Sequence, residues 1–324
     1  MADKPEKPFH YGGQAVIEGV MMRGRNDFAV AVRRTSGEIV TTTENIEKSI
    51  LGRMKWLDKP FLRGTLALID AMTLGIKALK YSADVAMQDA MAEDAAAQSD
   101  VSPNPLPEKS AQEPSGKSRV NDVAVGAMMV VGLALGLGLF FFLPIVIVRP
   151  LKTGLDLPTW QLTAIEGGVK ISLFVLYVSL ISLMKDIRRV FQYHGAEHKT
   201  INAYEGGAEL TVDGVVEYNK VHVRCGTSFI LVVLVTSIIV FMFIGWDNIL
   251  VRFALKLALL PLVAGVAYEV IRFAGGRKDS VITRLVLLPG LLMQKITTRE
   301  PEPEMIEVAI RSLKCVLDKE TVKT

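Results

Sequence analysis

The segment Gln192–Lys199 holds the residues of this chain best suited to metal chemistry. His194 and His198 are two of only four histidines and stand four positions apart, which on a helix places both imidazoles on one face. With Glu197 they spell H-x-x-E-H, the inverted zincin pattern, in which two histidines hold zinc and the glutamate activates water. The pattern predicts a zinc site with Glu197 as the general base. The alternative is a solvated helix whose histidines bind nothing, and Gly195 weakens the helix prediction by about 1 kcal/mol relative to alanine.

A catalytic zinc ion needs three protein ligands and one open position, and the spacing fixes only two of them. We favour His222 as the third ligand. Cys225 is the second choice, because a thiolate at the start of a helix is stabilised by the helix dipole, although a small residue packed where a helix enters the membrane is an equally good interpretation. Glu269 is the third candidate, since inverted zincins take a distant glutamate as their remaining ligand and an ionisable residue within a span suggests function. An ion pair with Arg272 would explain Glu269 without a metal.

The Gly-rich segment Gly12–Gly24 is the second unusual feature of the sequence. Glycine permits close backbone approach or a positive φ. On a strand Gln14 and Glu18 share a face, so Glu18 could add a carboxylate to a site, with Arg23 as an anion contact. The segment lacks the Lys-Ser/Thr ending of a phosphate-binding P-loop. We favour a turn and an edge strand in which Glu18 pairs with a nearby arginine.

The composition indicates a membrane protein. Half of the residues are hydrophobic while 22% are charged, so the apolar residues must be segregated into spans. The apolar runs predict four spans, the second of which extends back toward Ala164: Val123–Val148, Val169–Met184, Gly226–Trp246 and Phe253–Phe273. The run Val281–Met293 is too short and is interrupted by Arg284 and Pro289, so we interpret it as re-entrant or interfacial.

The distribution of Lys and Arg orients these spans. The N-terminal region up to Arg119, the segment between the second and third spans, and the segment after the fourth are rich in positive charge, which places all three in the cytoplasm. We therefore expect a multi-pass protein of the bacterial inner membrane with both termini and the His194 segment cytoplasmic. The N-terminus lacks an apolar signal-peptide run. Cys225 and Cys315 lie on the reducing side, so no disulfide is expected.

The expected fold class is a mainly α-helical integral membrane protein with a small N-terminal cytoplasmic region that contains a β-hairpin. Phe28–Val32 and Ile39–Thr43 alternate as strands and form this hairpin. Five regions follow from the patterns: a Gly-rich and β-rich region at 1–58, an amphipathic helix on the membrane or the spans at 59–91, a flexible linker at 92–119, a membrane domain at 120–299 with a cytoplasmic His-containing loop at 185–225, and a C-terminal cytoplasmic helix at 300–324.

Four strings of the sequence resemble the YqhQ-like bacterial membrane proteins. They occur in the same order and the similarity runs from about residue 10 to 315: GGQAVIEGVMMRG at 12–24, HGAEHK at 194–199, HVRCGTSF at 222–229 and TTREP at 297–301. The resemblance implies a domain of unknown function that is sometimes described as a predicted metal-dependent enzyme, without an established substrate.

Three classes of function are compatible with the sequence. The first is a membrane-embedded zinc-dependent hydrolase that acts at the cytoplasmic membrane surface on a lipid-linked or membrane-proximal peptide substrate. The second is a non-catalytic metal-binding membrane scaffold or regulatory protein. The third is a transporter, for which Lys256 and Glu269 within the fourth span are the main support.

Zinc is the expected cofactor and membrane lipid the expected partner, and association into a homo-oligomer stays open. The formal net charge of +3 is explained by cytoplasmic loops near anionic lipid. No basic run interleaved with aromatic residues indicates nucleic-acid binding.

Overall fold

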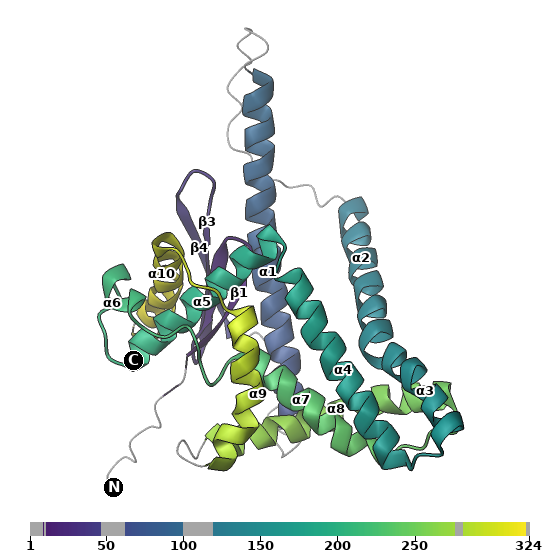
Figure 1. The fold of residues 1–324 in the computed structure, drawn as a ribbon. Helices are drawn as coiled ribbons and strands as arrows, with labels where there is room; N and C mark the ends of the chain where they lie inside the picture. The colour runs from purple at the N-terminus through teal and green to yellow at the C-terminus, as the bar shows by residue number, and fades with distance from the viewer. Residues whose placement is uncertain (1–8, 10, 47–61, 100–118, 276–280, 322–324) are drawn as a thin grey trace. The chain divides into compact units, whose positions relative to one another are not determined.

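The computed structural model describes residues 9, 11–46, 62–99, 119–275 and 281–321 (Figure 1). These residues form two compact units, which we describe separately. Unit 1 comprises Met1–Ala90, Val175–Ser237 and Leu260–Thr324, and unit 2 comprises Met91–Phe174 and Ile238–Leu259. Most of the described residues are helical, as expected.

Unit 1 contains a four-stranded antiparallel sheet in the order β1-β2-β3-β4. Its strands are β1 (Gly12–Val16), β2 (Gly19–Arg23), β3 (Asp27–Arg33) and β4 (Ile39–Asn45). The expected hairpin is present as β3 and β4, with Val30 opposite Thr42. The sheet is larger than that hairpin, because the Gly-rich segment supplies two further strands whose short length and glycine content hide the alternation in the sequence.

The two faces of the sheet pack against different helices. Met22, Ala29 and Ala31 share a core with α5 (Lys185–Glu205) and α10 (Pro303–Thr321). Alternate residues point the other way, as a pleated strand requires, and pack against Leu74, Ala78 and Val85 of α1 (Leu62–Ser99); they include Met21, Val30 and Val32. The N-terminal strands and the C-terminal helix, expected as separate regions, therefore form one folded body with α5.

Helix α1 is the amphipathic helix expected at 59–91, and it packs within unit 1 on two neighbours. Beyond the sheet, its first turns lie against α8 (Ile249–Gly275), where Thr65 donates a hydrogen bond to the Pro261 carbonyl at 2.8 Å. The helix continues to Ser99, so the first residues of the segment expected as a flexible linker are helical. The rest of that segment, 100–118, lies outside the described residues.

Three helices, rather than the expected four, are long and apolar enough to cross a membrane within the described residues. They are Val130–Leu155, Thr159–Ile181 and Ile249–Phe273. The first runs through α2 (Arg119–Leu137), a π-helical turn η4 (Gly138–Phe142) and α3 (Leu143–Leu155), and the second is α4.

The run expected to span at Gly226–Trp246 forms the shorter helix α7 (Gly226–Phe241), because the chain turns at 242–248. Its 16 residues extend about 24 Å, against about 30 Å of hydrocarbon. Helix α9 (Val281–Thr297), which contains the run interpreted as re-entrant or interfacial, is also below the spanning length and holds Pro289 inside it.

Candidate metal centre

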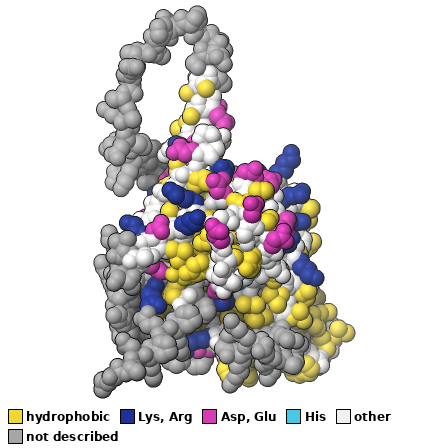
Figure 2. All heavy atoms as spheres, turned by 90° about the vertical axis from the view of Figure 1, so that its left-hand side faces the viewer, with side chains coloured by type: hydrophobic (Ala, Val, Ile, Leu, Met, Phe, Trp, Pro, Cys, Tyr) yellow, Lys and Arg dark blue, Asp and Glu magenta, His cyan; other side chains and the backbone are white. Residues whose placement is uncertain are grey.

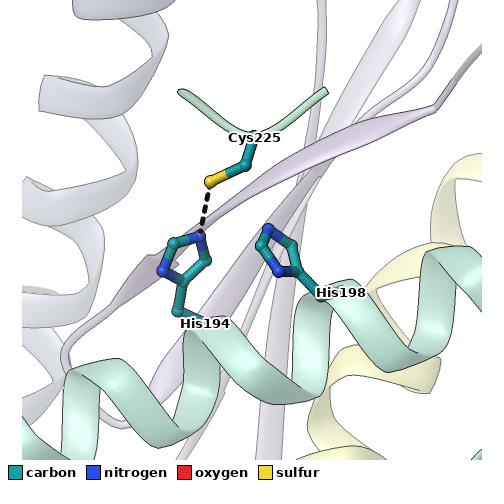
Figure 3. Close-up of side chains that lie close together, drawn as sticks. All are labelled: His194, His198 and Cys225. Atoms are coloured by element: carbon teal, nitrogen blue, oxygen red, sulfur yellow. Dashed lines mark hydrogen bonds between the residues drawn. The ribbon is translucent and has the colours of Figure 1, made fainter. Parts of the chain in front are cut away.

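The two histidines of the H-x-x-E-H pattern lie on one face of α5, as predicted. Their ring centroids are 4.4 Å apart. The Cys225 thiol reaches the same place from the residue before α7, and Figure 3 shows both imidazoles projecting from α5 toward it. One ligand atom from each of His194, His198 and Cys225 lies within 4.8 Å of the other two. In a tetrahedral zinc site neighbouring ligand atoms are about 3.3 to 3.7 Å apart, so a small contraction would complete the geometry.

Backbone carbonyls fix the orientation of both imidazoles. His194 Nδ1 lies 2.8 Å from the Thr297 carbonyl oxygen, and His198 Nδ1 lies 2.7 Å from the Lys220 carbonyl oxygen. Since a carbonyl oxygen only accepts hydrogen bonds, each Nδ1 carries the proton and each Nε2 keeps its lone pair. Metal-binding histidines in proteins are held in this way. In both rings Nε2 is thus the nitrogen that can bind a cation.

Cys225 occupies the N-cap position of α7. Its carbonyl accepts the Ser228 N–H, and its sulfur lies 3.4 Å from the donating N–H of Thr227. The sulfur is also 3.2 Å from His194 Nε2. The Cys225 sulfur thus lies at the same point as the two imidazoles, and cysteine sulfur is an ordinary zinc ligand.

Glu197 lies beside this cluster and is almost completely buried, with 4% of its surface exposed. Its Oε2 is 3.4 Å from His198 Nε2. Burial raises the pKa of the Glu197 carboxyl to about 7, while the charge of His194 and the backbone N–H of Gly13 act to lower it. A cation bound at the cluster would also act to lower the pKa of the Glu197 carboxyl. The carboxyl group is therefore positioned next to the free imidazole nitrogen and shielded from bulk water.

Two glycines allow the segments around the cluster to approach one another. A Cβ on Gly13 of β1 would lie 2.7 Å from Glu197 Cγ, closer than real Cβ atoms come. A Cβ on Gly195 would overlap the Arg299 carbonyl oxygen, at a point where the Arg299 N–H also bonds the Phe191 carbonyl at 2.8 Å. The glycine that weakened the helix prediction is thus required by packing.

The four strings noted in the sequence meet at this centre. Gly13 comes from the first string, His194 and His198 from the second, Cys225 from the third, and Thr297 and Arg299 from the fourth. Lys199 and Lys220 hold Glu300 of the last string, with nitrogen–oxygen distances of 2.5 and 3.2 Å. The face drawn in Figure 2 carries acidic and basic side chains side by side, and no histidine of the described residues is visible on it.

The structure places His222, our favoured third ligand, next to the cluster but outside the group of three. Its ring centroid is 5.6 Å from that of His198, and its Nε2 is 3.9 Å from Glu205 Oε2. Gln294 holds the His222 backbone from both sides, with two hydrogen bonds of 2.9 Å. Of the two candidates in this loop, Cys225 is the one brought to His194 and His198.

The remaining candidates are engaged elsewhere in unit 1. Glu269 forms a two-pronged ion pair with Arg63 of α1, at 2.6 and 2.5 Å, and is not part of the cluster. Glu18, in the turn between β1 and β2 with φ of 49°, forms a similar pair with Arg189, at 2.6 Å for both bonds. This is the arginine pairing that we favoured for Glu18. Arg23 instead binds Asp70 of α1 at 2.7 Å.

Comparison with known proteins gives a family but no activity. The family described as "Protein of unknown function (DUF1385)" matches residues 59–319. The chain is 34% identical over 313 residues to the "Uncharacterized protein YqhQ" of Bacillus subtilis (strain 168), covering 95% of this chain and 92% of that protein. No solved structure matches the chain.

Proposed function

Because the chain belongs to the DUF1385 family, whose description names no activity, we propose a function from the site itself: a membrane-associated, zinc-dependent hydrolase. One observation carries the proposal. The lone-pair nitrogens of His194 and His198 and the capped sulfur of Cys225 converge within 4.8 Å, and the other nitrogen of each imidazole is tied to a backbone carbonyl. A solvated helix with idle histidines would have no need of either feature.

The ligand types fit zinc, which binds imidazole nitrogen and thiolate sulfur. Two histidines and one cysteine are a three-ligand set that leaves a fourth position for water or substrate. Zinc supplies Lewis acidity and makes water acidic near neutral pH. Glu197 would accept the proton of the attacking water, since its carboxyl lies beside His198 and is not one of the three ligand groups.

The packing of unit 1 supports a position on one side of the membrane. Val20 of β2, Ala196 of α5 and Ile306 of α10 belong to one hydrophobic core, so the chain must cross the membrane an even number of times between each pair of these segments. Two candidate spans precede α5, but only Ile249–Phe273 follows it. The short helix α7 would supply the missing crossing, with local thinning of the bilayer. Four crossings with the site in the cytoplasm then agree with the charge distribution.

A non-catalytic metal centre is the second candidate, and the position of Glu197 favours it. Its Oε2 is 3.4 Å from His198 Nε2, so a small shift of the side chain would make it a fourth ligand. A centre closed by four protein ligands is typical of structural zinc. The two functions differ in one property, which is whether a coordination position is open.

Cobalt substitution tests this difference. The purified full-length chain would be loaded with Co²⁺, and its visible spectrum recorded before and after addition of azide, a small anion that binds only an open position. We expect the wild-type spectrum to change, and Glu197→Gln to keep its metal and its response to azide. In a strain that lacks the gene for this chain, Glu197→Gln should fail to restore any lost phenotype.

The opposite results would favour the non-catalytic centre. They are a wild-type spectrum that azide leaves unchanged, loss of metal in Glu197→Gln, or full complementation by that variant. Gln is nearly isosteric with Glu and still accepts hydrogen bonds, but it cannot take a proton at neutral pH, so the variant separates proton transfer from packing. Asp318→Asn, an exposed change on α10, is the matched control and should behave as wild type in all three measurements.

A further inference from the structure

Unit 2 contains a second cluster of ionisable groups, buried between helices long enough to cross a membrane. Glu166 and Lys170 of α4 are each 2% exposed, and Arg252 and Lys256 of α8 are 1% and 0% exposed. Glu166, Arg252 and Lys256 lie in the N-terminal halves of their helices, and Lys170 lies at the midpoint of α4. Ionisable residues at membrane depth are costly and mark functional positions.

The single carboxylate of this cluster is fully used by two of the cations. Glu166 Oε2 accepts hydrogen bonds from Arg252 at 2.7 and 3.3 Å, and Glu166 Oε1 binds Lys256. The remaining donors of Arg252 are bound by the Thr163 hydroxyl and by the Ile244 and Gly245 carbonyls. The guanidinium also stacks on Trp246, with 3.9 Å between Cζ and the ring centroid. Arg252 therefore has no donor left for another group.

The two lysines are the opposite case. Lys170 forms no hydrogen bond or ion pair with any residue that the structure describes, and its ammonium lies over two aromatic rings, those of Phe141 in η4 and Phe241 in α7, at 5.0 and 5.1 Å from the centroids. The Lys256 ammonium is 5.4 Å from the same Phe241 centroid. The Lys170 and Lys256 ammonium groups thus lie near the same ring, and of the two only Lys256 has a carboxylate oxygen as hydrogen-bond acceptor.

In their ionised forms the four side chains are three cations and one carboxylate, an excess of two positive charges. Uncompensated charge in a low-dielectric interior is strongly unfavourable. Rings attract cations through their quadrupole, but they carry no net charge and accept no strong hydrogen bond. The cluster therefore lacks a negatively charged group with several oxygens that could accept hydrogen bonds.

We propose that Lys170 and Lys256 form a phosphate-binding site inside the membrane-spanning unit, with Glu166 and Arg252 as its fixed frame. A phosphate group carries up to two negative charges and several acceptor oxygens, which matches the excess charge and the N–H groups that the two ammonium groups leave unused. It can be inorganic phosphate or the headgroup of an anionic lipid. The site shares no residue with the metal centre, so it stands whether or not the proposed hydrolase activity does.

Trp246 is an internal fluorescence reporter of the site, because its ring stacks on the Arg252 guanidinium. In a Trp56→Phe, Trp160→Phe background it is the only tryptophan. The full-length chain would be placed in phosphatidylcholine nanodiscs and titrated with inorganic phosphate while Trp246 emission is recorded. We expect a saturable change, with the apparent affinity at least about tenfold weaker in Lys170→Met, which loses one ammonium. Lys170→Arg should retain binding. Lys152→Met is the matched control, since Lys152 pairs with the exposed Asp247, and it should bind as wild type.

A second arm distinguishes the two sources of phosphate. If the ligand is a lipid headgroup, Trp246 emission will differ between phosphatidylglycerol and phosphatidylcholine nanodiscs in wild type but not in Lys170→Met, and inorganic phosphate will add nothing. Phosphate or phosphatidylglycerol should also raise the wild-type Tm and leave that of Lys170→Met unchanged.

Three results would overturn the proposal. The first is the absence of any response to both ligands, and the second is an unaltered response in Lys170→Met. The third is a Lys170→Met protein that unfolds in phosphate-free phosphatidylcholine, because removal of an uncompensated charge should not destabilise the empty site.

Discussion

Gly13 lies directly against the buried side chain of Glu197, although the two residues stand far apart in the sequence. The contact is so close that a Cβ on Gly13 would lie 2.7 Å from Glu197 Cγ and 2.6 Å from the Met21 carbonyl oxygen. The first strand of the sheet therefore forms one wall of the candidate metal centre. This gives the Gly-rich segment a specific role, which is to let the backbone reach a buried carboxyl group.

Substitution of Gly13 should consequently harm the site. We expect Gly13→Ala to lower the free energy of unfolding by about 1 to 3 kcal/mol, as overpacking does, and to fail in complementation as Glu197→Gln does. Gly12→Ala is the control, since a Cβ there meets nothing within 4 Å. Thermal unfolding of the purified variants measures the difference. Equal effects of the two substitutions would contradict the role given to Gly13.

The choice between Cys225 and His222 as third ligand can be decided by metal analysis. We expect His194→Ala, His198→Ala and Cys225→Ser to lose bound zinc, because each removes one of the three converging atoms. His222→Gln should keep about one zinc per chain, measured by elemental analysis of protein purified without chelators. Retention of zinc by Cys225→Ser together with its loss in a folded His222→Gln protein would restore His222 as the ligand.

Gly195 provides a test of the contact between α5 and the segment after α9. Alanine is the better helix former by about 1 kcal/mol, so Gly195→Ala would stabilise an isolated helix. In the protein we expect a net loss of about 1 to 3 kcal/mol, because the new Cβ overlaps the Arg299 carbonyl oxygen. Gly168→Ala in α4, where a Cβ meets nothing within 4 Å, should be neutral or stabilising. A Gly195→Ala protein with an unchanged Tm would mean that the two segments are not in contact.

The four-crossing topology predicts where cysteines can be labelled. In a Cys315→Ser background, an impermeant thiol reagent added to intact cells should modify Thr153→Cys, which is exposed at the end of α3. It should modify Glu307→Cys, exposed on α10, only after the cells are lysed. The reverse pattern would mean the opposite orientation in the membrane. Modification of both positions in intact cells would mean an even number of crossings between them, instead of the three (α4, α7 and α8) that this topology requires.

Regular periodicity made several elements predictable. The i,i+4 histidines, the β3–β4 hairpin and the C-terminal amphipathic helix each follow from spacing within one segment. The choice of Cys225 did not, because both candidates lie in an irregular loop whose path depends on Gln294, 72 positions away from His222. Two further groups that orient the site are the backbone carbonyls of Thr297 and Lys220. Every residue has a backbone carbonyl, so residue identity cannot predict this role.

The second span was predicted at Val169–Met184 with an extension back toward Ala164, whereas α4 begins at Thr159. Glu166 and Lys170 interrupt the apolar residues in that part of the sequence. The partners of Glu166, Arg252 and Lys256, are more than 80 positions away, and no local pattern shows that charges on two helices will be buried together.

The joint core of the sheet and α10 has a consequence for biosynthesis. Strands β1 to β4 are synthesised before the helix that covers one of their faces, and the three described helices that are long and apolar enough to cross a membrane are made in between. Until then that apolar face has no native cover, and the segments that hold Glu197, His194 and Arg299 cannot close around one another. Contacts between residues so distant in sequence slow folding and expose intermediates to aggregation. Assembly of the candidate metal centre is thereby coupled to the synthesis of α10, so a chain truncated before that helix would be unable to form it.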